Sequence, residues 1–146
     1  MDPMDALMTA TQFPAILPSL TGLGLVALGG AAGAVARYHM AAAIERRLGT
    51  AMPWGTLVVN LSAALLAGGL LALFNLGRLP VPAGWLLLIA GLLGSYSTVS
   101  SFSIQTLVLA RQHGYPLRAL LYVLLSVTGC LVLVTGGYLL GVWCCG

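Results

Sequence analysis

A cluster of hydroxyl side chains stands inside an uncharged stretch of this sequence. No charged residue occurs between Arg78 and Arg111, yet six of the nine residues from Ser95 to Ser103 are serine or threonine. Gly91 and Gly94, just before the cluster, lower helix propensity. Unpaired polar groups are costly in hydrocarbon, so such a segment survives at membrane depth only when protein buries it or a wet cavity adjoins it. The stretch therefore predicts a broken membrane helix whose freed peptide groups face an ion or water path.

Other polar residues recur at helical spacing in apolar stretches. Asn60 is the only amide within residues 55–74, and Thr56 lies one turn earlier on the same face. A polar residue inside a membrane is a functional hypothesis by default, and the alternative is an interhelical hydrogen bond that only holds the bundle together. Tyr122 and Ser126 are also one turn apart. They form either a track of hydrogen-bond donors or ordinary back-bonds to the preceding turn.

Arg37 lies near the end of the first apolar stretch, beside Tyr38. It either snorkels from a helix end, with Tyr38 in an aromatic belt, or has a structural or electrostatic role near a water-filled vestibule.

Composition predicts the elements that must position these residues. Of the 146 residues, 60% are apolar and 6% are charged, whereas a soluble chain carries roughly a quarter charged residues. The chain is therefore expected to be an all-α integral membrane protein, and each of its four predicted spans is long enough for roughly 30 Å of hydrocarbon. These spans are residues 20–44, 55–74, 84–110 and 117–141.

The remaining segments are expected to be short. Residues 1–19 contain three prolines and lack the basic start of a secretory signal, so they are treated as an N-terminal extension of a channel domain at 20–146. Glu45, Arg46 and Arg47 are expected in a water-exposed loop. The net charge of +3 comes from arginines that are better explained as topology determinants than as a nucleic-acid surface. No acid/base pair, activated nucleophile or metal-ligand cluster predicts an enzyme.

Three motifs occur in order along the chain. They are Gly29-Gly30-x-x-Gly33-x-x-x-Arg37-Tyr38, then Pro53-Trp54-Gly55-Thr56-x-x-Val59-Asn60, then the stretch from Gly94 to Gln105. Together they resemble the CrcB/Fluc fluoride channels, whose third-helix pattern is Gly-Gly-x-Thr-Thr-Phe-Ser-Thr-Phe-Ser-x-Glu. The resemblance covers all four predicted spans.

The resemblance implies an architecture and a function. The fold would be a four-helix subunit, its third helix broken mid-membrane, in an antiparallel, dual-topology dimer with two pores. The dimer would sit in the cell inner membrane as a multi-pass protein and let fluoride leave the cytoplasm passively. A structural sodium ion at the centre would be held by main-chain carbonyls, which on this sequence belong to Gly94 and Ser97 of both subunits.

The resemblance also assigns a fluoride pathway. The family's pore asparagine corresponds to Asn60, its two pore phenylalanines to Val99 and Phe102, and its fourth-helix hydroxyl track to Tyr122 and Ser126, followed by Cys130. Fluoride is small and strongly hydrated, so compact donors suit it, and a phenyl edge carries partial positive charge. The hydroxyls of Ser100 and Ser101 are further candidate donors, whereas Arg37 and Thr56 are assigned structural or electrostatic roles.

Some residues depart from the family pattern. Val99 removes one aromatic edge, Gln105 replaces an acid, and Tyr96 and Ser95 replace the commoner phenylalanine and glycine. Such a pore would conduct more slowly, select less sharply, or need a non-identical subunit that supplies the missing ring.

The arginines leave a related choice open. With short loops, they fall unevenly on the two sides: Arg46, Arg47, Arg111 and Arg118 on one, Arg78 on the other. Charge asymmetry sets insertion direction, so a heterodimer with an oppositely inserted paralogue stands beside the homodimer.

Two other classes of function remain open. A small four-helix exporter coupled to protons would need an intramembrane carboxylate, and the only acids, Asp2, Asp5 and Glu45, lie outside the predicted span cores. A non-conducting structural subunit would use the hydroxyl cluster only for helix packing.

Overall fold

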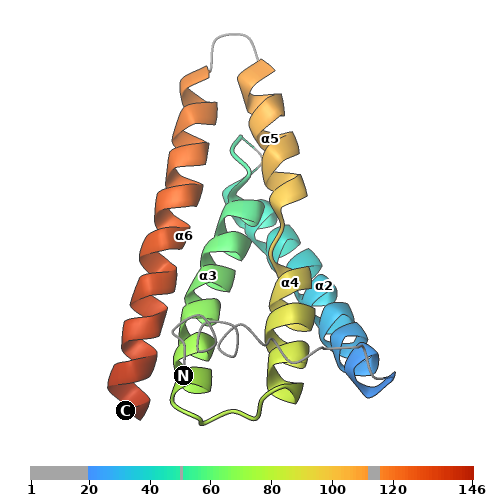
Figure 1. Cartoon of the computed structure of the whole chain (residues 1–146). Helices are drawn as coiled ribbons and strands as arrows, with labels where there is room; N and C mark the ends of the chain where they lie inside the picture. Colours follow the sequence, from blue (N-terminus) through green and yellow to red (C-terminus); the bar gives the residue numbers. More distant parts are fainter. Residues whose placement is uncertain (1–19, 50, 112–115) are drawn as a thin grey trace, which may run out of the picture.

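The computed structural model describes residues 20–49, 51–111 and 116–146, and the predicted extension at 1–19 lies outside these ranges. The elements are all helical (Figure 1). They are α2 (Leu20–Leu48), α3 (Trp54–Asn75), η1 (Trp85–Leu93), α4 (Gly94–Tyr96), α5 (Val99–Arg111) and α6 (Pro116–Cys145). Taking η1 through α5 as one stretch, the described residues form four helical segments long and apolar enough to cross a membrane, which confirms the predicted class.

The first helix is longer than the sequence indicates. Glu45, Arg46 and Arg47 were expected in a loop, but α2 continues through them to Leu48. Basic side chains in the last turn of a helix interact favourably with the negative end of the helix macrodipole. Arg46 and Arg47 therefore stabilise the last turn of α2. The helix ends where Gly49 takes a positive φ of 78°, a conformation that favours glycine.

Two helix pairs form the body of the protein. The most extensive pairing is α3 with α6, and the next is α2 with η1 (Figure 1). Glycines allow the close approach: a Cβ at Gly29 or Gly33 would overlap the main-chain carbonyls of Leu87 and Leu92. The Gly29/Gly33 pair therefore lets the third segment approach α2 closely.

The third segment is irregular along its length. Residues Trp85–Leu93 are wound as a π-helix, a rare form that frequently occurs at functional sites. The helix then ends at Tyr96, because Ser97 is extended (φ −73°, ψ 158°), and it resumes at Val99. Figure 1 shows this interruption between α4 and α5.

Candidate functional site

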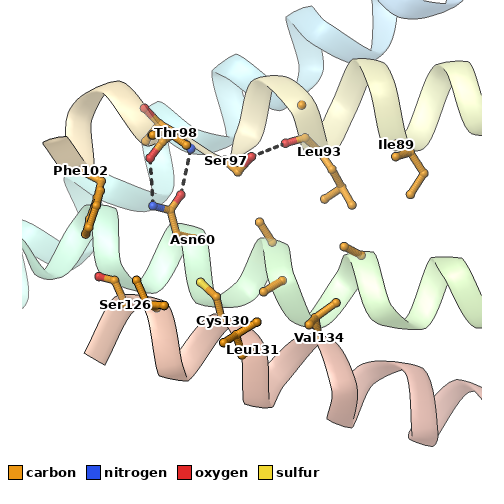
Figure 2. Close-up of a pocket in the computed structure, with 16 residues that line it drawn as sticks. Asn60, Ile89, Leu93, Ser97, Thr98, Phe102, Ser126, Cys130, Leu131 and Val134 are labelled. Atoms are coloured by element: carbon orange, nitrogen blue, oxygen red, sulfur yellow. Dashed lines mark hydrogen bonds between the residues drawn. The ribbon is translucent and has the colours of Figure 1, made fainter. Parts of the chain in front are cut away.

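Asn60 of α3 makes hydrogen bonds to the main chain at the interruption in the third helical segment. Its Nδ2 donates to the carbonyl of Thr98 at 3.0 Å, and the Thr98 N–H donates to Asn60 Oδ1 at 2.9 Å (Figure 2). The side-chain amide thus binds both main-chain groups of the one residue between Ser97 and α5. An amide nitrogen carries two hydrogens, so one N–H of Asn60 remains beyond this pair.

The interruption redirects two helical hydrogen bonds. In a continuous helix the Thr98 N–H would donate to the Gly94 carbonyl, and the Ser101 N–H to the Ser97 carbonyl. Here the Thr98 N–H donates to Asn60, and the Ser101 N–H donates to Thr98 Oγ1 at 3.3 Å. The carbonyls of Gly94 and Ser97 therefore lose their usual donors.

These two carbonyls are the groups that the family resemblance assigns to sodium. Within the described residues, no cluster of three or more histidine, cysteine or acidic side chains offers an alternative cation site. Unwound main-chain carbonyls are suitable oxygen ligands for Na⁺ in membrane proteins. The freed oxygens of Gly94 and Ser97 therefore fit such an ion chemically.

An open groove of about 560 Å³ runs along α3, the interruption and α6 (Figure 2). Its wall is mostly apolar, and its lining includes most of the residues that the sequence analysis assigned to the fluoride pathway and to the sodium site. Those residues are Asn60, Gly94, Ser97, Val99, Phe102, Ser126 and Cys130. Val99 is 77% exposed at this groove, so its side chain meets no large partner within the described part of the chain.

A second cavity, of about 340 Å³, lies between α2, the start of α3 and α5. We call it the polar cavity, because its lining includes the side chains of Arg37, Glu45, Thr56, Ser101 and Gln105. Arg37 and Thr56, the two residues assigned structural or electrostatic roles, thus both line this cavity and not the groove. Among the described residues, Thr98 alone lines both the groove and the polar cavity.

Ser126 has the least satisfied hydroxyl of the described residues. It is 5% exposed, lines the groove, and its Oγ has no hydrogen-bond partner. Buried polar groups are nearly always paired, so this hydroxyl is an exception whose proton has no acceptor among the described residues. Figure 2 shows Ser126 on α6 near Phe102.

Tyr122 is placed differently from its predicted role as a pore hydroxyl. It is fully buried, its Oη donates to Gln105 Oε1 at 3.1 Å, and it does not line the groove. Its ring packs against Phe102 with centroids 5.4 Å apart. Tyr122 therefore packs against the ring of Phe102 and donates a hydrogen bond to Gln105, the residue that replaces the family's acid.

Thr98 is the residue that sequence reasoning missed. Its Oγ1 donates to Ser101 Oγ at 3.1 Å, lies 3.3 Å from Ser100 Oγ, and accepts the Ser101 N–H. Thr98 is thus the N-cap of α5, and both predicted hydroxyl donors, Ser100 and Ser101, are bound to it. A threonine directly before a helical run is a recognisable N-cap signal that could have identified it.

Comparison with known proteins decides the family. Residues 24–138 match the model of the CrcB-like protein family, also described as Camphor Resistance (CrcB). The chain belongs to this family. The sequence-based assignment to CrcB is thereby confirmed.

Relatives of this CrcB chain are named as fluoride-specific ion channels. It is 45% identical over 123 residues to Fluoride-specific ion channel FluC 2 of Bradyrhizobium diazoefficiens, covering 83% of this chain and 89% of that protein. It is 42% identical over 120 residues to Fluoride-specific ion channel FluC of Rhodospirillum rubrum, covering 81% and 86%. CrcB proteins are ion channels and not enzymes, so that expectation is confirmed, and the chain is a multi-pass membrane protein.

Proposed function

We propose that this chain is a subunit of a fluoride-selective channel that lets fluoride leave the cytoplasm passively across the cell inner membrane. The observation that carries the proposal is the Asn60–Thr98 pair at the edge of a groove that also holds Phe102 and Ser126. The relatives named as fluoride-specific channels align with more than four fifths of the chain, which supports the same conclusion.

The pathway follows the groove. Dehydrating fluoride requires compact donors, and two are available: the second N–H of Asn60 and the unpaired hydroxyl of Ser126. The edge of Phe102 adds a weakly positive contact that offers no competing acceptor. Donors spread along a wall bind the ion weakly enough to release it, which conduction requires.

A structural sodium ion completes the site at the interruption, at mid-membrane. The carbonyls of Gly94 and Ser97, freed by the contacts of Thr98, are the ligands from this chain. Two carbonyls make only part of a sodium shell, so an antiparallel second subunit supplies the matching pair. The cation also favours anions in the nearby field.

A second copy of the chain is the simplest partner, and a paralogue is the second candidate. The ends of α2 and α5 and the start of α6 lie at one end of the bundle, and these segments carry every described arginine except Arg37 and Arg78 (Figure 1). At the other end, Arg78 Nη2 donates to the Cys145 carbonyl at 2.8 Å. This asymmetry of arginines favours one direction of insertion, which is why an oppositely inserted paralogue is kept as the second candidate.

Purified protein in liposomes loaded with potassium fluoride tests the function. We expect fluoride release, measured with a fluoride electrode after a potassium ionophore is added, and little chloride release from matched vesicles. Fluoride release no faster than from protein-free vesicles would count against the homodimer. Co-reconstitution with a paralogue that carries phenylalanine at the position of Val99 would then test the paired channel.

A further inference from the structure

Tyr96, the last residue of α4, makes a partly buried hydrogen bond to α3. It is 6% exposed, and its Oη lies 2.8 Å from Ser62 Oγ. Ser62 Oγ in turn donates to the Val59 carbonyl at 2.9 Å. A serine hydroxyl has one proton, so Tyr96 is the donor of this pair. The phenol is thus tied to α3 through a short relay.

This contact lies on the other side of the interruption from the Asn60 pair. Asn60 holds Thr98, Ser62 holds Tyr96, and Ser97 stands between the two. Ser97 is joined to the α4 side, because its N–H and Oγ both donate to the Leu93 carbonyl, at 3.0 and 2.9 Å. Helix α3 therefore makes hydrogen bonds to both neighbours of Ser97, Tyr96 before it and Thr98 after it.

The ring of Tyr96 is packed in the core, and the hydrogen bond of its hydroxyl fixes the orientation of the ring relative to α3. The ring belongs to a core cluster with Val59, Ala63 and Leu93. On the opposite side, Gly33 of α2 lies against the Tyr96 main chain, where a Cβ would come within 3.1 Å of its nitrogen. With α4 held between two helices, the remaining freedom is rotation about its axis, and the Ser62 contact limits it.

We propose that Tyr96 and Ser62 are positioning residues that fix the Gly94 and Ser97 carbonyls relative to α3 and thereby set the affinity for the structural sodium ion. The proposal rests on the proposed function, because it concerns the cation site of the same channel. Gly94 opens the three-residue α4 that Tyr96 closes, and Ser97 is hydrogen-bonded to the same side, so a rotation of α4 would move both carbonyl oxygens relative to α3 and Thr98. Ligands held in place before the ion arrives bind it more tightly.

The test compares Tyr96→Phe, Ser62→Ala and the double variant in full-length protein. The readouts are the sodium concentration for half-maximal fluoride release from liposomes and the rise in melting temperature that sodium produces, with N-methylglucamine as the replacement cation. A typical net hydrogen bond corresponds to about a fivefold change, so Tyr96→Phe should raise the sodium requirement about fivefold. Ser62→Ala should have at least this effect, because it leaves the Tyr96 hydroxyl buried and unpaired.

The double variant separates positioning from general damage. Both single changes break the same bond, so the double variant should match Tyr96→Phe and not multiply the two effects. Tyr138→Phe is the matched control: its hydroxyl accepts from Asn75 Nδ2 at 3.4 Å, at the far end of α3, and its loss should leave the sodium requirement unchanged.

Other outcomes overturn the proposal. A Tyr96→Phe protein that melts earlier but keeps the wild-type sodium requirement has lost only packing stability. Wild-type release and melting that both ignore sodium would remove the cation site and the positioning role together. If wild-type vesicles release no fluoride, the homodimeric channel fails, while the sodium-dependent melting of the same variants still decides the role of Tyr96.

Discussion

The side chain of Asn60 pairs with the main chain of Thr98 through two hydrogen bonds, of 3.0 and 2.9 Å. This is the contact that a neighbouring peptide would make, supplied here by an amide from another helix. The sequence left two roles open for Asn60, an interhelical tie and a pore donor. The geometry gives it the first role fully and leaves one N–H for the second.

Replacing Asn60 with aspartate should stop conduction. A carboxylate cannot donate to the Thr98 carbonyl, and its charge repels an anion in the groove. We expect fluoride release to fall by at least about tenfold, since truncating one partner of a buried pair costs roughly 1–3 kcal/mol. Asn75→Asp, at the exposed end of α3, is the control. Unchanged release from Asn60→Asp in the liposome assay would remove Asn60 from the pathway.

Ser126→Ala should change stability and conduction in opposite directions. Its hydroxyl is buried without a partner, so removing it should raise the free energy of unfolding by about 1 kcal/mol. The same change removes a donor from the groove, and fluoride release should fall about fivefold. Thermal melting in detergent and electrode-measured release report the two effects. Thr135→Val, whose exposed hydroxyl donates to the Leu131 carbonyl, should leave fluoride release unchanged. A Ser126→Ala protein that conducts normally would contradict the donor role.

Adjacent glycines on α6 should respond differently to alanine. A Cβ at Gly137 would overlap the Leu65 carbonyl of α3, whereas a Cβ at Gly136 meets nothing within 4 Å. Gly137→Ala should therefore destabilise the fold by about 1–3 kcal/mol. Gly136→Ala should be neutral or stabilising by up to about 1 kcal/mol, because alanine has the higher helix propensity. Melting temperatures of the two purified variants check this, and equal values would mean that α3 and α6 do not pack this closely.

Val99→Phe should improve conduction by the chain reconstituted alone. Val99 is 77% exposed at the groove, so a larger ring can be accommodated, and it would add a second aromatic edge. Since aromatic contacts contribute about 0.5–1.5 kcal/mol, release should rise roughly two- to tenfold. Val99→Leu controls for size without a ring. A loss of release in Val99→Phe, with Val99→Leu unaffected, would contradict this prediction and show that an aromatic ring at this position obstructs the pathway.

Hydropathy and motif order were enough to predict the four spans and the family, because membrane insertion depends on the apolar content of each stretch. The cross-helix contacts could not be predicted the same way. Whether Tyr96 reaches Ser62, or Tyr122 reaches Gln105, depends on the rotation of one helix against another, and hydropathy carries no such information. Tyr122 has a pore-like spacing with Ser126, yet its ring lies in the core.

Thr98 lines both the groove and the polar cavity, so the wall between these spaces is a single residue thick. A smaller side chain at Thr98 would therefore connect the groove with the polar cavity.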